Sequence, residues 1–255
     1  MKRIRVLSTA LIVLAVGGST AAHAQDRGKR PDQQDKHGQQ DQHAQQDQHG
    51  QQNRVPPQEQ QRRIQEEQQR NNQYRQRLDQ QAQVVRQQTD QLQQEKRAAQ
   101  FRAQQEYAAR IQQQQRQQAQ IQRDRNYAND PYVNTPHNYR YNVGGTYHQT
   151  NQYGVEVLRQ AVNNGYVEGV RAGQADRQDR WPANFQNSPA YRNADYGYNG
   201  NYVDRSDYNY YFRQGFQRGY QDGYNSRSQY GSYSNGNGSI LGNILSTILG
   251  LQTIR

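Results

Sequence analysis

The chain has no cysteine in its 255 residues. This absence excludes a disulfide framework, a thiolate metal site, a cysteine nucleophile and a lipid-modified cysteine behind an N-terminal leader. Hydrophobic residues are also scarce, at 31% of the chain, with one methionine, one tryptophan and four phenylalanines. A chain this poor in apolar side chains has material for at most one small folded domain.

A strong excess of one charge is missing as well. The formal net charge is +10, but three of the positive charges belong to the first five residues. The remainder is spread thinly along the chain and is mixed with acidic residues. This is a mild basic bias and not a basic patch, so we expect no specific nucleic-acid partner.

The first apolar run lies near the start of the sequence, at residues 6–16, behind three basic residues. The small-x-small sequence Ala22-His23-Ala24 follows it. Together these features predict a cleaved secretory signal peptide over residues 1–24. The alternative is an uncleaved membrane anchor, but the run is shorter than a bilayer span requires. The mature protein is therefore expected to be exported, to the periplasm or the medium, and not to span a membrane.

A low-complexity segment follows, over residues 25–57. It contains three copies of a six-residue Asp-x-His repeat, with His37, His43 and His49 at the repeated position. The segment has almost no apolar residue and is predicted to be disordered. Three imidazoles beside carboxylates suit weak binding of Zn, Ni or Cu. The competing interpretation is sequence drift in a glutamine-rich linker.

Residues 58–128 are rich in Gln, Arg and Glu and contain no glycine or proline. These are good helix formers. Apolar residues recur at seven-residue spacing along half of a coiled-coil seam, with Asn71 filling one gap: Ile64, Leu78, Val85, Leu92 and Ala99. The pattern predicts one long, mostly solvated helix or weak coiled coil. A fluctuating helix in a disordered chain is the alternative.

Two copies of one glycine pattern, fifty positions apart, dominate residues 129–238. The six glycines, spaced four apart within each copy, are Gly165, Gly169, Gly173, Gly215, Gly219 and Gly223. Residues four apart share a helix face, so each copy forms a smooth stripe. Close helix contact would offset the cost of glycine in a helix. We therefore predict an antiparallel helical hairpin with its glycine faces in contact; the alternative is a disordered Gly/Tyr/Asn tract.

The surroundings of the two glycine copies supply further expectations. Asn151 is a possible cap for the first helix, and Ser206 or Asp207 for the second. Eighteen of the 20 tyrosines lie at Tyr127 or later, where they either replace aliphatic residues in packing or offer aromatic faces to sugar rings. Residues 181–204, which connect the two copies, are expected to wrap over the surface of the hairpin, with Trp181, Phe185 and Tyr191 as packing contacts.

The C-terminal half also has a recognisable order of motifs. They are Gly165/Gly169/Gly173, then Ala194-Asp195-Tyr196-Gly197-Tyr198, then Gly215-Phe216, Gly219-Tyr220 and Gly223-Tyr224. This order resembles uncharacterised exported proteins of acidobacterial-type soil bacteria, which carry glycine-spaced helices and Gly-Tyr-x-x repeats. The resemblance covers about the last 100 residues and implies this layout and export, without a catalytic residue. The first copy departs from the pattern at Gly169-Val170 and Gly173-Gln174, so the two helices need not be equivalent.

The last segment, residues 239–255, contains isoleucine-leucine pairs every four residues. They are Ile240, Leu241, Ile244, Leu245, Ile248 and Leu249. The spacing predicts an amphipathic helix capped by Ser239, too short to cross a bilayer. We expect it to dock onto the glycine hairpin, to pair with another copy, or to meet an envelope partner.

The predicted fold class is mostly α with extensive disorder. It combines a long Gln/Arg-rich helix, a small glycine-faced hairpin and a short C-terminal amphipathic helix. No histidine lies in a catalytic motif, and the glycine repeats lack the strand and Gly-Lys-Ser/Thr of a phosphate loop. We therefore expect no enzyme activity and no cofactor. The function expected is that of an exported cell-envelope structural or interaction protein; the alternative is a weak metal or polyanion binder.

Overall fold

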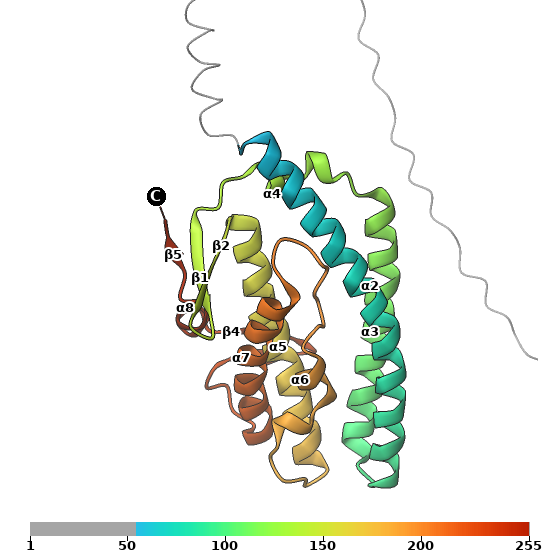
Figure 1. Cartoon of the computed structure of the whole chain (residues 1–255). Coiled ribbons are helices and arrows are strands. Elements are labelled where there is room, and N and C mark those ends of the chain that lie inside the picture. Colours follow the sequence, from blue (N-terminus) through green and yellow to red (C-terminus); the bar gives the residue numbers. More distant parts are fainter. Residues whose placement is uncertain (1–54, 255) are drawn as a thin grey trace, which may run out of the picture. The chain divides into compact units, whose positions relative to one another are not determined.

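A computed structural model describes residues 55–254 (Figure 1). The predicted leader and the Asp-x-His repeats, with His37, His43 and His49, lie outside the described residues. Within residues 55–254 the chain is mostly helical, which confirms the predicted fold class. None of the helices described there combines the length and the apolar character that a bilayer crossing requires.

The glutamine-rich segment forms two antiparallel helices and not one long helix (Figure 1). Helix α2 spans Pro57–Gln94 and α3 spans Ala98–Asp124. The chain reverses over three residues, where Lys96 adopts a left-handed backbone conformation with φ of 58°. The side chain of Gln115 donates to the carbonyl oxygen of Leu78 at 2.7 Å, across the pair. The prediction of a single, mostly solvated helix is therefore wrong.

The seven-residue seam nevertheless faces inward. Leu78, Val85 and Leu92 are buried, and the partner α3 buries glutamines beside its apolar residues. Gln114 shows how this works: its Nε2 donates to the carbonyl oxygen of Tyr198 at 2.7 Å, and its Oε1 accepts from the backbone N–H of Gly197 at 3.0 Å. A glutamine with both ends satisfied can occupy a core position at little cost.

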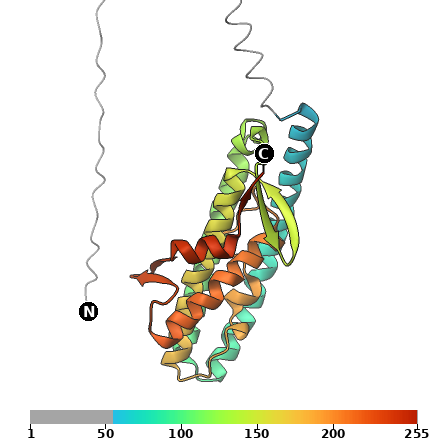
Figure 2. The ribbon, with the colours of Figure 1, turned by 90° about the vertical axis from the view of Figure 1, so that its left-hand side faces the viewer.

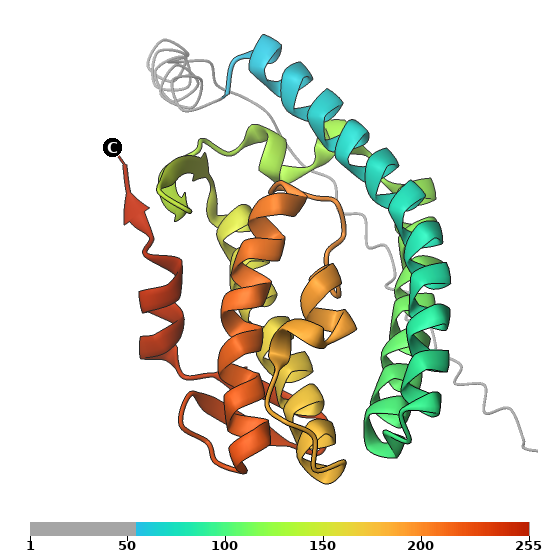
Figure 3. The same ribbon diagram turned by 60° about the horizontal axis from the view of Figure 1, so that its bottom comes forward.

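The glycine stripes are in contact, between α5 (Gln152–Gln178) and α7 (Arg205–Asn225). A Cβ added to Gly165 would overlap the carbonyl oxygen of Phe212, and one added to Gly173 would overlap that of Tyr220. The contacts advance in the same direction along both helices. The two helices are therefore parallel, and the predicted antiparallel hairpin is wrong (Figure 3).

The two glycine copies make equivalent contacts with each other. A Cβ on Gly215 would overlap the carbonyl oxygen of Val162, while one on Gly165 would overlap that of Phe212. Val162 and Phe212 are themselves fifty positions apart, and the other two glycine pairs follow the same rule. Each copy thus meets the other as in an isologous dimer interface. The parallel direction brings the two copies together in register.

The segment between α5 and α7 returns the chain to the start of the pair. It carries η2 (Phe185–Asn187) and α6 (Pro189–Asn193), which pack between the α5–α7 pair and the α2–α3 pair (Figure 3). Phe185 and Tyr191 meet edge to face at 5.0 Å between ring centroids. Both are half-buried against the core, as is expected of packing residues.

Helix caps confirm one prediction and correct another. Asn151 precedes α5, and its side chain accepts from the backbone N–H groups of Tyr153 and Gly154. Helix α7 begins at Arg205, with Asp204 at its cap position, two or three residues before the expected caps. Ser206 and Asp207 consequently lie inside its first turn and are not its cap.

Two β-hairpins were not predicted. Strands β1 (Tyr139–Val143) and β2 (Thr146–Thr150) are joined by two glycines with positive φ. Strands β3 (Gly231–Ser234) and β4 (Asn237–Ile240) are joined by Asn235 and Gly236, also with positive φ. Asn-Gly and Gly-Gly are strong two-residue hairpin signals. Two short turns complete the region before β1: η1 (Tyr127–Asn129) and α4 (Pro131–Asn134).

The C-terminal segment is a composite and not one helix. Ile240 ends β4, α8 spans only Gly242–Leu249, and β5 (Gln252–Thr253) pairs antiparallel with β1. Ser239 lies in β4 and caps nothing. Helix α8 contacts α5 and α7 (Figure 2), so the expected docking onto the glycine pair is confirmed.

Tyrosines fill much of the core. Tyr198, Tyr208 and Tyr211 are fully buried. Their hydroxyl groups donate to backbone carbonyl oxygens at 2.8–2.9 Å. A buried tyrosine needs such a partner. This supports the packing interpretation of the tyrosine-rich half for these residues.

Candidate ligand pocket

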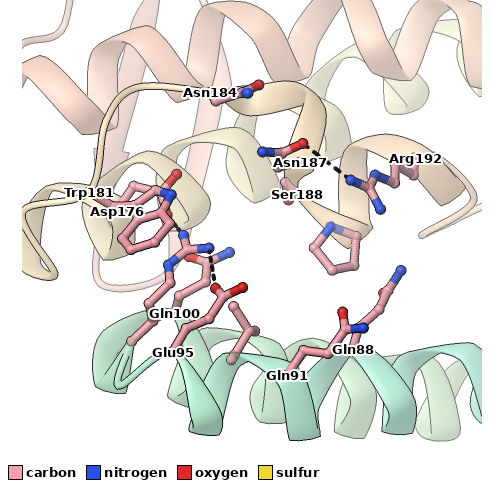
Figure 4. A pocket seen from close by; sticks show the side chains of 13 residues that line it. Gln88, Gln91, Glu95, Gln100, Asp176, Trp181, Asn184, Asn187, Ser188 and Arg192 are labelled. Atoms are coloured by element: carbon pink, nitrogen blue, oxygen red, sulfur yellow. Dashed lines mark hydrogen bonds and ion pairs between the residues drawn. The ribbon is translucent and has the colours of Figure 1, made fainter.

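A polar pocket of about 210 Å³ lies where the α2–α3 turn meets the chain that follows α5 (Figure 4). One wall comes from the end of α2 and the start of α3, with Gln88, Gln91 and Gln100. The other wall comes from the connection to α7, with Trp181, Asn184 and Ser188 among its residues. Figure 4 shows the glutamines on one side of the pocket and the asparagines on the other.

The two walls are held together at the start of α3. Asp179, which directly follows α5, accepts from the backbone N–H groups of Ala99 and Gln100, both at 2.8 Å. Arg97, which precedes α3, provides no side-chain cap. A carboxylate at a helix N-terminus satisfies free N–H groups and favours the helix dipole. The end of α5 therefore fixes where α3 begins and where Gln100 lies.

Arg97 is one of the residues that line the pocket. Its guanidinium forms an ion pair with Asp176 and lies 4.4 Å from the ring centroid of Trp181. A second carboxylate, that of Glu95, is 3.6 Å away. Arg97 is 8% exposed. Its planar group can thus serve a carboxylate and an aromatic ring together.

Asp176 is the most buried charge at this site. Tyr220 donates its hydroxyl to Asp176 Oδ2 at 2.6 Å. Burial raises the pKa of Asp176, and the hydrogen bond from Tyr220 and the charge of Arg97 oppose that rise. The same burial, together with its bond to Asp176, raises the pKa of Tyr220. This group of three side chains is held by internal partners.

A second cleft, of about 740 Å³, is lined by arginines from α2 and the start of α7. Arg62, Arg70, Arg77 and Arg205 line it together with two acidic residues. Arg205 is engaged by Asp195 at 2.8 Å. We call this site the arginine cleft. In the sequence these basic residues are spread thinly, and they converge only because α7 lies near α2 in the folded chain.

One histidine forms the pair that most resembles catalytic machinery among residues 55–254. His148 Nδ1 lies 3.0 Å from Asp207 Oδ2, and the hydroxyl of Tyr141 donates to the same oxygen at 2.7 Å. Ser206 Oγ donates to the other oxygen of Asp207 at 3.1 Å. The serine therefore contacts the carboxylate and not the imidazole. This is not the order that activates a serine nucleophile.

The site residues expected from the sequence fall into three groups. The six glycines form a packing interface and no ligand site. The C-terminal isoleucines and leucines are divided: Ile240 and Leu249 are buried, and Leu241 is 44% exposed. The three repeat histidines lie outside the described residues. Within those residues, no group of three metal-ligating side chains is close enough to hold an ion.

The pocket residues were missed because they come from segments that sequence analysis treated as separate modules. Gln88, Arg97 and Gln100 lie in the glutamine-rich segment, while Asp176 and Trp181 follow the first glycine copy. The single tryptophan was the one visible signal, and it was assigned to packing. Comparisons with known proteins add nothing here: no family model, curated protein or solved structure matches the chain.

Proposed function

We propose that the mature chain is an exported, non-catalytic protein of the cell envelope that assembles with a second copy or with another envelope protein. The signal-like residues 1–24 support export. The resemblance to exported acidobacterial-type proteins points the same way. The C-terminal segment supports assembly, and its partly exposed apolar residues carry the proposal.

In the C-terminal segment, the first and last of the six isoleucines and leucines are buried, and those between them are partly exposed. Ile240 and Leu249 are buried, while Ile244, Leu245 and Ile248 are half-buried against the core. Leu241 is 44% exposed, and Tyr147 on the neighbouring hairpin is 55% exposed. Strand β2 forms one edge of the three-stranded sheet and β5 the other. Open strand edges beside exposed apolar side chains are typical of surfaces that pair with another chain.

Replacing Leu241 tests the assembly proposal. Because the side chain is already largely exposed, Leu241→Ser should leave the melting temperature nearly unchanged. It should shift the mature chain towards the monomer in light scattering across a concentration series. Val84→Ser is the matched control, since Val84 on α2 is 42% exposed and lies outside the C-terminal segment.

If the wild type is monomeric at every concentration, the partner must be another envelope protein. Capture from envelope extract with wild-type bait, and loss of that protein with the Leu241→Ser bait, would then support the proposal. Equal behaviour of the Leu241→Ser and Val84→Ser variants in both measurements would contradict it.

The arginine cleft favours a second candidate, a weak polyanion binder. Four guanidinium groups face one cleft, and Arg77 forms no ion pair within the described residues. Binding to an anionic polymer such as heparin should then weaken with salt and with Arg77→Gln. Weak Zn, Ni or Cu binding by His37, His43 and His49 remains a prediction from the sequence.

A further inference from the structure

The pocket of Figure 4 has polar atoms that the protein itself leaves without a partner. Among the described residues, Gln88 Oε1, Gln100 Oε1 and Arg97 Nε are buried and make no hydrogen bond. Gln100 is 5% exposed and Arg97 is 8% exposed. A buried polar group without a partner costs about 1–3 kcal/mol. Gln88, Gln100 and Arg97 all line this pocket, so a ligand bound there lies beside the side chains that carry these atoms and reaches them after a small side-chain rotation.

The pocket selects the ligand by charge and by hydrogen bonding. Its lining holds two carboxylates, Glu95 and Asp176, and two guanidinium groups, Arg97 and Arg192. Since these charges balance, the pocket favours an uncharged ligand. The two glutamine oxygens need donors, and Arg97 Nε needs an acceptor. Hydroxyl groups supply both.

The volume of the pocket and its aromatic residue narrow the chemical class of the ligand further. At about 30 Å³ per water, a volume of 210 Å³ corresponds to roughly seven waters. It is smaller than the ~300–1,000 Å³ of pockets that hold drug-sized ligands. Trp181 provides an aromatic ring in a mostly polar lining that also contains Leu92 and Pro189. We propose that this pocket binds one uncharged sugar ring of monosaccharide size, a role separate from the assembly proposed above.

The chain provides its own probe of this site. Trp181 is the only tryptophan in the sequence, so intrinsic tryptophan fluorescence reports the pocket alone. Titration of the mature protein with glucose, galactose and N-acetylglucosamine should shift the emission saturably for at least one sugar. The same sugar should raise the melting temperature, because a ligand that binds only the folded state stabilises it. Glycine and sulfate serve as zwitterionic and anionic comparisons.

Gln100→Leu removes one of the unsatisfied acceptors while keeping a side chain of similar shape. Because that oxygen has no partner in the free protein, the variant should keep or gain stability. Its sugar affinity should fall at least about tenfold. Gln118→Leu is the matched control: Gln118 is on the same helix, is equally buried and also has an unpartnered Oε1, but it does not line this pocket.

Several outcomes would overturn the proposal. They are the absence of any emission or melting response to the three sugars, a response to glycine or sulfate in place of the sugars, and equal loss of affinity in the Gln100 and Gln118 variants. If Gln100→Leu fails to fold by circular dichroism, Gln88→Leu repeats the test from α2. Unchanged sugar affinity in that variant would be equally decisive.

Discussion

A glycine in α5 or α7 is a packing residue whose value lies in the missing side chain. At Gly169 an added Cβ would overlap the carbonyl oxygen of Phe216 and lie 2.7 Å from the backbone nitrogen of Tyr220. Both are backbone atoms, so no side chain can rotate away to make room. Glycine costs about 1 kcal/mol relative to alanine in a helix. The close approach of two backbones offsets this cost through dispersion and Cα–H···O contacts.

Gly169→Ala should therefore destabilise the protein although alanine is the better helix former. Forcing the helices apart costs up to about 3 kcal/mol against the gain of about 1 kcal/mol in propensity. We expect a net loss of about 2 kcal/mol in urea unfolding. Gly242→Ala in α8 is the control: a Cβ there meets no atom within 4 Å, so stability should stay equal or rise. A Gly169→Ala variant as stable as the wild type would show that the stripes do not touch.

At the scale of elements, the reversal between α2 and α3 decides the architecture of the N-terminal half. Lys96 has a φ of 58° and an exposed side chain. The left-handed region costs a residue with a Cβ about 1 kcal/mol or more, and glycine occupies it freely. A chain of good helix formers thus turns back at a position with no glycine or proline to mark it.

Lys96→Gly should consequently stabilise the pair by up to about 1 kcal/mol, measured as a higher melting temperature or urea midpoint. Gln94→Gly, two residues earlier at the end of α2, is the opposite control and should destabilise by up to about 1 kcal/mol. If residues 57–124 formed a single continuous helix, both variants would be less stable than the wild type, since glycine is unfavourable throughout a helix.

Element by element, the sequence predicted local features better than orientations. The cap at Asn151 and the inward seam through Leu78 and Val85 are confirmed, because each depends on neighbours along one helix. The parallel order of α5 and α7 was missed, because a hairpin is the shortest way to connect two helices. The 26-residue segment between them shows no sequence pattern that indicates whether α7 runs parallel or antiparallel to α5. The two β-hairpins were missed although their Gly-Gly and Asn-Gly turns were visible.

At the scale of the whole molecule, burial of ionisable groups should govern the response to acid. Burial lowers the pKa of His137 to about 4 from an ordinary value of 6.5, with the charge of Arg63 acting in the same direction and that of Glu59 opposing it. The unfolded chain therefore takes up this proton first as the pH falls. Stability contributed by neutral His137 is present above pH 6.5 and is lost between pH 6.5 and about 4.

Buried carboxyl groups act in the opposite direction. Burial raises the pKa values of Glu67, Asp176 and Asp195, so the folded state binds their protons at higher pH than the unfolded state does. Their protonation adds stability as the pH falls. Glu59 acts in the same direction as His137, because its hydrogen bond with Arg62 lowers its pKa to about 2. The acid response of the protein therefore combines opposing contributions, and a variant of His137 isolates one of them.

His137→Gln should remove the histidine contribution. The full shift corresponds to about 3 kcal/mol at 1.36 kcal/mol per pKa unit, and partial solvent access reduces it to about 1–2 kcal/mol. Between pH 7.5 and 4.5 in urea unfolding, the wild type should lose about this much more stability than the variant. Parallel pH profiles for the two proteins would contradict the prediction.

The sequence by itself determined the secondary structure class, the glycine interface and the C-terminal docking segment. Each depends on spacing along one helix, which the order of residues specifies directly. Only the tertiary structure decided that the glycine helices run parallel, that the glutamine-rich segment folds back, and that Arg97, Gln100 and Trp181 line one pocket. Those outcomes depend on contacts between residues far apart in the chain, and the low-complexity α2 and α3 carry almost no local signal that selects among such contacts.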